Sequence, residues 1–251
     1  MKKMVAAIFA LWFLCLFEIA TAEFNLGGEQ FSGFALFSWE SQYVFSIGIK
    51  ASKHPHFSQE FSLSHDGSGA YIGASFSESP SPGLDGRDDK EFNAGLIRRG
   101  WKHNFNMKFS HIRITDAGPL NELSLQVDSS EHPFYYKGSY LIALWKNSPS
   151  SGFFNRVGTI KSFSVSLWRG YDQVVTLEGY VGGTIGGALG IKSGFTHAAA
   201  TVSFPIPLIG SVELTPKFGY QFTFPGYRGT GKGDISNDNP KWGMLTLKYK
   251  F

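Results

Sequence analysis

Seven histidines are the side chains of this sequence best suited to metal binding or proton transfer near neutral pH. His54 and His56 flank Pro55 and could share a metal ion. A protein metal site needs at least a third ligand, and no third ligand accompanies this pair. The pattern therefore predicts no metal site and no cofactor.

Nucleophilic catalysis needs a base within hydrogen-bonding reach of the nucleophile. His197 and Ser203 share one face of an extended segment, but six residues separate them by roughly 20 Å. His111 lies near Asp116, an arrangement that a lipid or peptide hydrolase at the rim of a barrel would suit. The same pair is commoner as the polar end of a strand. We predict no catalytic residue and keep the rim hydrolase as an alternative.

Charged residues that alternate with apolar ones carry more information. In the segment 101–109, for example, apolar side chains at odd positions face away from Lys102 and Lys108 at even positions. Such period-two alternation is typical of strands with one apolar and one polar face. Nine charged residues fall on the polar faces, and we predict that they line the inside of a barrel: Glu40, Glu60, Lys102, Lys108, Glu178, Glu213, Lys217, Lys248 and Lys250.

The alternation predicts about 12 antiparallel strands, with ten as the alternative count. Their predicted ranges are 37–49, 57–65, 70–77, 91–97, 101–114, 121–127, 134–144, 161–167, 174–181, 195–204, 212–224 and 242–251. A switch of apolar parity near Ser110 indicates a bulge, and Pro216 indicates a local break or bulge. The glycine-rich stretch 182–190 lacks the residues of a phosphate-binding loop and is predicted to be an outer loop, or strand ends where backbones pack closely.

The predicted connections alternate between short turns and longer loops, as in outer-membrane barrels. The turns fall at 65–69, 98–100, 128–133, 168–173 and 205–211, and the outer loops at 50–56, 78–90, 115–120, 145–160, 182–194 and 225–241. Five tryptophans lie near predicted strand ends, where aromatic girdles meet the membrane surface: Trp39, Trp101, Trp145, Trp168 and Trp242.

The N-terminal segment has the form of a signal peptide. Lys2 and Lys3 precede the uncharged apolar run 4–17, and Ala20-Thr21-Ala22 fits a cleavage site. The run is shorter than the roughly 20 residues that a membrane-spanning helix needs. We therefore predict a cleaved signal peptide, 1–22, and a mature domain, 23–251. The only cysteine, Cys15, is removed with it, which leaves the mature chain no disulfide and no thiolate.

The bulk composition narrows the functional classes. Of the 251 residues only 17% are charged while 16% are aromatic, which fits a barrel with one face in lipid. The net charge of +3 is mild, and no basic patch with interleaved aromatics predicts nucleic-acid binding. A secreted soluble β-sandwich would share this composition and is the alternative fold.

The C-terminal segment carries the strongest local signal. Leu245, Leu247, Tyr249 and Phe251 share one face, opposite Thr246, Lys248 and Lys250. Apolar residues toward lipid and polar residues toward the lumen are what a barrel strand needs. The terminal aromatic residue resembles the C-terminal assembly signal of bacterial outer-membrane proteins. That resemblance implies recognition by the barrel-assembly machinery.

Motifs in the first half of the chain resemble a known family. They are Tyr43-Val44-Phe45, a polar stretch with Pro55 and Gln59, Gly69-x-Tyr71-x-Gly73, Ser75, Ser77, and Glu91 after a loop; Leu214-Thr215-Pro216 and Tyr220 add a looser match. This order resembles the Gcw_chp, or TorF-like, family of porin-type outer-membrane barrels. That family often has Arg-Gly where this chain has Ser46-Ile47-Gly48. The family has no well-defined activity, so the resemblance implies a fold.

Together these patterns predict an all-β transmembrane antiparallel barrel in the bacterial outer membrane, in contact with lipid and lipopolysaccharide. The predicted function is a porin-like channel for passive diffusion of small hydrophilic solutes. Two alternatives stay open: a structural or adhesive barrel with a plugged lumen and partner-binding outer loops, and the rim hydrolase.

Overall fold

The computed structural model describes residues 24–26, 29–41, 43–44, 50–52, 55–78, 89–100, 102–114, 118–144, 151–166, 172–186, 193–224 and 239–251. The predicted signal peptide, most of the predicted outer loops, His54, Asp116, Trp101, Trp145 and Trp168 lie outside these residues. The described residues hold no helix long and apolar enough to cross a membrane.

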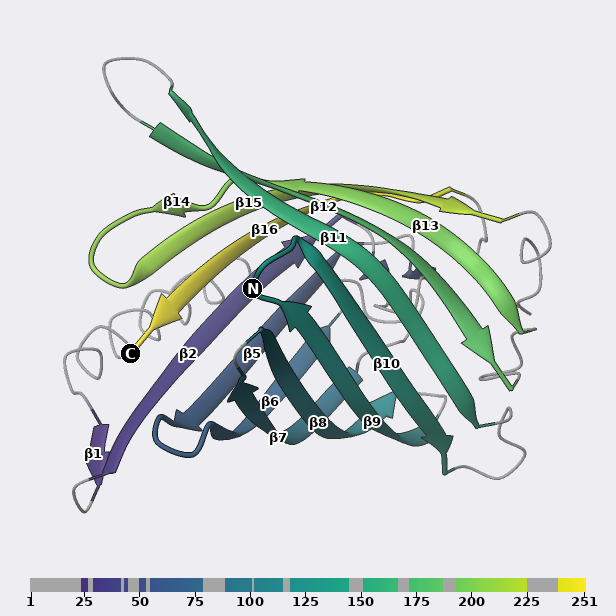
Figure 1. The fold of residues 1–251 in the computed structure, drawn as a ribbon, viewed down its shortest axis with the longest axis horizontal. Helices are drawn as coiled ribbons and strands as arrows, with labels where there is room; N and C mark the ends of the chain where they lie inside the picture. Colours follow the sequence, from purple (N-terminus) through teal and green to yellow (C-terminus); the bar gives the residue numbers. More distant parts are fainter. Residues whose placement is uncertain are drawn as a thin grey trace, which may run out of the picture.

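Twelve antiparallel strands form a closed barrel, as predicted (Figure 1). Each strand pairs with its neighbours in the sequence, and β2 closes the ring by pairing with both β5 and β16. The barrel strands are β2 (Glu29–Glu40), β5 (His56–His65), β6 (Ala70–Glu78), β7 (Asp89–Arg99), β8 (His103–Ile114), β9 (Gly118–Ser129), β10 (Phe134–Ala143), β11 (Gly152–Ser166), β12 (Asp172–Ile185), β13 (Gly194–Ser203), β15 (Val212–Thr223) and β16 (Lys241–Lys250).

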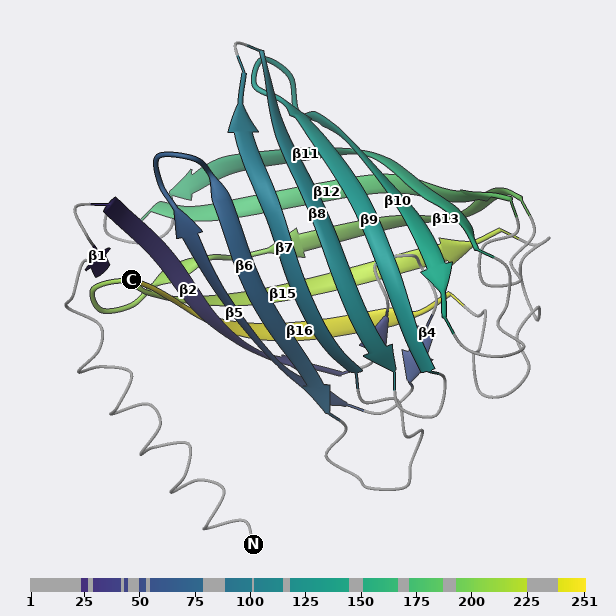
Figure 2. The ribbon, with the colours of Figure 1, turned by 90° about the horizontal axis from the view of Figure 1, so that it is seen from below.

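Four short strands accompany the barrel. β1 (Phe24–Leu26) pairs with β2, and β14 (Ile206–Pro207) pairs with β15. β3 (Tyr43–Val44) and β4 (Lys50–Ser52) form a separate two-stranded sheet. The turn between β5 and β6, the loop that carries β14 and the C-terminus gather at one end of the barrel (Figure 2). The turns there fall where short connections were predicted.

The barrel is polar inside and apolar outside. Among the described residues, 16 polar or charged side chains are buried against only 8 hydrophobic ones. Large apolar side chains such as Ile72 and Phe92 are more than half exposed on the outer face. A water-soluble domain buries its apolar side chains instead, so this distribution suits a barrel surrounded by lipid. It argues against the alternative of a soluble sandwich.

The predicted first strand is wrong in its position. β2 ends at Glu40, whereas the range 37–49 was predicted. Phe34 and Leu36 have the inward parity of Ser38 and Glu40, so the segment before residue 37 lacks clean alternation. The interior of a small barrel is filled by side chains, and some of them are apolar. Because Phe34 and Leu36 are apolar on the inward face, this segment lacks the alternation by which strands were predicted.

The predicted bulge at Ser110 is absent. β8 keeps one register with both neighbours from Asn104 to Ile114. Ile112 and Ile114 therefore point inward, where they pack against a buried cluster of Leu120, Leu141 and Phe154. The switch in apolar pattern marks a change in what fills the lumen, from polar groups to an apolar cluster.

Two predicted outer loops are too long: the loop 145–160 ends too late, and the loop 182–194 begins too early. β11 starts at Gly152 and β12 runs to Ile185, so parts of the segments predicted as loops at 145–160 and 182–194 are paired strand. The real bulge lies in β13: Gly182 pairs with His197 but Gly183 pairs with Phe195, which leaves Thr196 as the extra residue.

Pro216 causes no break in β15, whose pairing with β16 runs through it without a shift. The Pro216 carbonyl accepts a hydrogen bond from Phe204 N at 3.0 Å, just past the paired end of β13. An N–H group at position 216 would also point toward β13, where the pairing of β13 with β15 ends. The proline therefore removes no hydrogen bond from the paired part of these strands. Trp242 lies near the end of β16, as predicted, but its ring lies over Gly219 on the inner face and does not belong to an aromatic girdle facing lipid.

Candidate functional site

An open cavity of about 530 Å³ occupies part of the barrel interior. Strands β2, β5 to β10 and β16 line it, and eight of the lining residues are serine, asparagine or glutamine. Six charged residues also reach it: Glu60, Glu91, Lys108, Lys137, Lys248 and Lys250. We call this space the open cavity. Its lining resembles that of an aqueous passage, since hydroxyl, amide and charged groups all hold water well.

The charges of the open cavity are only partly neutralised. Lys108 Nζ donates to Glu91 Oε1 at 2.7 Å, and Ser110 Oγ donates to the same oxygen at 2.7 Å. Lys248 Nζ lies 4.7 Å from the centre of the Phe34 ring, a cation–π distance. Glu60, Lys137 and Lys250 form no ion pair within 4 Å among the described residues. These three side chains remain available to water and solutes.

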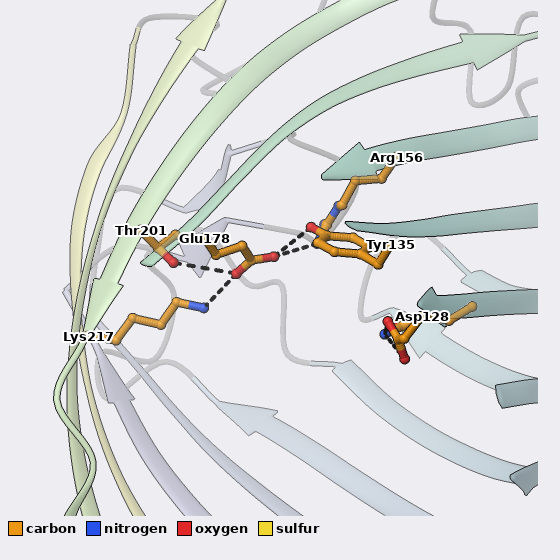
Figure 3. Close-up of polar contacts among 7 residues, drawn as sticks. Asp128, Tyr135, Arg156, Glu178, Thr201 and Lys217 are labelled. Carbon is orange, nitrogen blue, oxygen red and sulfur yellow. Dashed lines mark hydrogen bonds and ion pairs between the residues drawn. The ribbon is translucent and has the colours of Figure 1, made fainter. Parts of the chain in front are cut away.

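The opposite part of the interior is filled by a charged cluster around Glu178 (Figure 3). Tyr135 Oη donates to Glu178 Oε1 at 2.6 Å, while Thr201 Oγ1 and Lys217 Nζ approach Oε2 at 3.4 and 3.5 Å. Arg156 Nη1 lies 4.0 Å from Oε1. These five residues come from β10, β11, β12, β13 and β15, and we call their arrangement the packed wall.

An aromatic contact extends the packed wall toward the predicted outer end. The Arg156 guanidinium carbon lies 4.1 Å from the centre of the Tyr180 ring, and Tyr180 meets His197 edge-on at 5.7 Å. Among the described residues, paired charges and these aromatic contacts occupy much of this side of the interior. The packed wall therefore links five strands, whereas the open cavity lies mainly among the other strands of the barrel.

The predicted pore-lining residues lie in five different surroundings. Glu60, Lys108, Lys248 and Lys250 border the open cavity, and Glu178 and Lys217 belong to the packed wall. Glu40 is buried at the far end of β2, beside His56, and Glu213 accepts a hydrogen bond from Thr215. Lys102 instead lies before β8, in a half-exposed ion pair of 3.2 Å with Glu131. A role in lining a conducting pore stays a prediction for all nine.

Prediction from the sequence missed several charged or phenolic groups of the interior, among them four that lie at the open cavity or in the packed wall. Glu91 and Lys137 lie on the polar faces of strands that were predicted, so their parity could have revealed them. Tyr135 shares that face but looks apolar. Arg156 fell in a segment predicted as loop, and nothing in the local pattern marks it as an interior cation.

The C-terminal strand closes the barrel. Gly33 N donates to the Phe251 carbonyl at 2.7 Å, and Phe251 N donates back to the Gly33 carbonyl at 3.0 Å. The rings of Tyr249 and Phe251 stack, with centres 5.9 Å apart. Phe251 lies so close to Gly33 that a methyl group at position 33 would collide with its ring. Recognition of Leu245, Leu247, Tyr249 and Phe251 by the assembly machinery stays a prediction.

The geometry gives the hydrolase alternative no support among the described residues. His111 Nδ1 hydrogen-bonds Asn121 at 2.8 Å, and the exposed position of both places them on the outer face. The buried atom His197 Nε2 has no hydrogen-bond partner, so it does not activate a serine. No three His, Cys, Asp or Glu side chains of the described part of the chain lie close enough to hold a metal ion.

Comparison with solved structures identifies the fold. The KdgM porin superposes with a TM-score of 0.51 over 87% of this chain and 99% of its own, at 8% identity. The NanC porin gives 0.51 over 87% and 100%, at 7% identity. The fold is that of a porin barrel. A further KdgM structure, in complex with disordered oligogalacturonate, gives 0.50 at 8% identity, over 88% of this chain and 99% of that one.

Sequence comparison adds no closer relative. No family model matches this chain, and no curated protein sequence does either. The resemblance to the Gcw_chp family therefore stays a prediction.

Proposed function

We propose that this chain is a small porin-like channel of the bacterial outer membrane, through which small hydrophilic solutes diffuse passively. The observation that carries the proposal is the open cavity of about 530 Å³ inside a closed barrel, lined by polar and charged groups. The polar interior and apolar outer face are those of a channel-forming barrel.

The proposed location is the bacterial outer membrane. A signal peptide over residues 1–22 would export the chain, and cleavage near Ala22 would release the barrel domain. The outer face would contact lipid and lipopolysaccharide. Insertion would depend on the barrel-assembly machinery, with Leu245, Leu247, Tyr249 and Phe251 as the proposed recognition signal.

A plugged barrel is the second candidate, and the packed wall favours it. A 12-strand barrel is narrower than the 16–18 strands of wide porins, so side chains can fill much of it. Glu178 and its partners do so along five strands. A plugged barrel would act through the outer loops that bind partners, and no current would cross it.

Single-channel recording in a planar bilayer separates the two candidates. The mature chain is refolded, and its folded state is verified by heat-modifiable gel mobility before reconstitution. We expect discrete current steps, with the step size lowered when Ser124→Trp narrows the open cavity. A sealed bilayer from demonstrably folded protein would contradict the channel and favour the plugged barrel.

A further inference from the structure

Two neighbouring cations lie on the outer face of the barrel, at the start of β7 and the end of β8. Lys90 and Arg113 are direct partners in the β7–β8 ladder, and both side chains are exposed. They share the outward parity of Phe92 on β7 and Phe109 on β8, whose rings are exposed on the face that lipid surrounds. We call Lys90 and Arg113 the cation pair.

The two charges of the cation pair repel each other. Side chains directly opposite on antiparallel strands have Cβ atoms about 4.5–5.5 Å apart, and like charges there destabilise the ladder. Neither cation forms an ion pair with another described residue. Glu78, the exposed carboxylate at the end of the adjacent strand β6, has none among these residues either. An arrangement that is unfavourable by itself indicates an anionic partner from outside the chain.

Exposed aromatic rings lie beside the cation pair, toward the middle of the barrel. Lys90 pairs with Phe76 across the β6–β7 ladder, and Phe92 follows Lys90 by two residues, about 7 Å along the strand. The rings of Phe76 and Phe92 meet edge-on with centres 6.1 Å apart, and Phe92 is 56% exposed. This surface therefore suits an amphipathic anion, whose charged group would meet the cations while its hydrocarbon covers the rings.

The cation pair lies at the end of the barrel that has the long connections. β6 ends at Glu78 and β7 begins at Asp89, whereas β7 and β8 are joined at their other end by a short turn. Figure 2 shows the start of β7 and the end of β8 at the end of the barrel away from the C-terminus. Long connections face outward in outer-membrane barrels, and this orientation rests on the proposed function.

The outward-facing leaflet of that membrane consists largely of lipopolysaccharide, whose lipid A carries phosphate groups above its acyl chains. A guanidinium can bind phosphate through two parallel hydrogen bonds, and an ammonium adds a compact point charge. A phosphate between Lys90 and Arg113 would therefore turn their repulsion into attraction to a shared anion. Basic clusters at a membrane surface bind anionic headgroups in the same way.

We infer that the cation pair binds a phosphate group of lipid A and fixes one glycolipid molecule against β7 and β8. The acyl chains of this lipid extend over Phe76 and Phe92. The site lies on the outer face, so it is separate from the open cavity and from any solute inside the barrel.

Binding is measured by calorimetric titration of the refolded mature chain in a non-ionic detergent. The probes are lipid A with its phosphates and lipid A from which they have been removed. We expect saturable binding of the phosphorylated form and binding at least about tenfold weaker without the phosphates, since hydrogen bonds between charged groups are the strong ones. Lys90→Gln combined with Arg113→Gln should weaken binding of the phosphorylated form about tenfold or more.

The matched control combines Arg98→Gln with Lys161→Gln. These exposed cations lie on the outer face, opposite Phe105 and Leu177 in their ladders, but toward the end with the short turns. The control removes the same total charge and should leave the affinity unchanged. Each variant is first checked for heat-modifiable mobility, so that loss of binding is not loss of the fold.

Three results would overturn the inference. Equal affinities of the wild type and the Lys90 and Arg113 variant would show that the cation pair does not hold the lipid. An equal loss in the control variant would show that any exposed cation serves. Displacement of lipid A by excess inorganic phosphate would show a site for a free anion. The titration needs no ion flow, so lipid A binding by a barrel that fails to conduct would contradict the channel alone.

Discussion

The packed wall and the open cavity use the same residue types in opposite ways. In the packed wall, Glu178 gathers Tyr135, Thr201 and Lys217 around one carboxylate, with Arg156 at 4.0 Å. In the open cavity, Glu60 and the lysines at 137 and 250 have no ion pair among the described residues. Both regions face the same interior and are built on strands of the same barrel.

The difference lies in where the neighbouring strands place opposite charges. Glu178 lies between strands that supply a phenol, two cations and a hydroxyl within reach, so the side chains close over one another. Glu60 lies opposite Ser75 and Leu36, which offer it no cation in the ladder. The charges around Glu178 therefore fill one side of the interior, whereas the open cavity on the other side keeps charged side chains without an ion pair among the described residues.

The sharpest way to break this comparison is to remove each carboxylate in turn. Glu178→Gln leaves Lys217 and Arg156 without their counter-charge, and the Glu178 side chain is only 17% exposed. We expect the free energy of unfolding to fall by about 3–5 kcal/mol. Glu60→Gln is the matched control and should change it by less than about 1 kcal/mol. Urea unfolding in lipid vesicles measures both, and equal effects would remove the distinction between the regions.

Tight packing around the packed wall can be tested with glycines. A methyl group at Gly219 would collide with the Trp242 ring, whereas at Gly179 the nearest atom lies 3.9 Å away. We expect Gly219→Ala to destabilise the barrel by about 1–3 kcal/mol through overpacking. Gly179→Ala should be close to neutral. If the two variants unfold at the same urea concentration, the inner face at Gly219 is looser than the structure indicates.

The unpaired charges should act on ions instead of on stability. At about 10 Å in water, one charge changes the energy of an ion by about 0.4 kcal/mol, a factor of about two. Lys250→Gln should lower the permeability of chloride and raise that of potassium by about this factor each, so their ratio should fall about fourfold, read from reversal potentials in a salt gradient. Lys102→Gln, which removes a charge at the rim, is the control. An unchanged ratio in Lys250→Gln would mean that ions pass elsewhere.

The smallest effect is expected outside both regions. Glu131 and Lys102 form an ion pair whose side chains are 52% and 46% exposed. Glu131→Gln should change the free energy of unfolding by no more than about 1 kcal/mol, because water screens exposed charges. A loss as large as that for Glu178→Gln would show that pairing itself, and not burial, sets the contribution of these carboxylates.

Much of the barrel could be predicted because lipid and lumen impose strict alternation on each strand. The polar face of β8 before Ser110 and the outward face of β16 follow this rule. For both, the sequence predicted correctly which residues face inward and which face outward. The rule fails where inward side chains are apolar. Phe34, Ile112 and Ile114 fill the interior of a small barrel, so the pattern there predicted a late strand and a bulge.

The packed wall could not be predicted, because its contacts join strands far apart in the sequence. Tyr135 and Glu178 are 43 residues apart, and Glu178 and Lys217 are 39 apart. Parity places a side chain inside without saying which interior side chain it meets. The register shift at Thr196 in β13 is likewise marked by no local pattern of the sequence.

The pairing of β2 with β16, which we call the seam, has a consequence for how the barrel folds and inserts into a membrane. Ser38 and Thr246, bonded at 2.9 Å across it, are 208 positions apart in the sequence. Every other strand pair of the barrel joins strands that are neighbours along the chain, so the sheet can grow one strand at a time. Until the seam closes, the two outermost strands of this sheet keep unpaired edges. These strand edges are unstable in the hydrocarbon core of a membrane, because nothing there accepts a hydrogen bond from an unpaired backbone N–H group. The barrel can therefore be stable in lipid only once this seam is closed, and closure requires the first strand, β2, and the last strand, β16, at the same time.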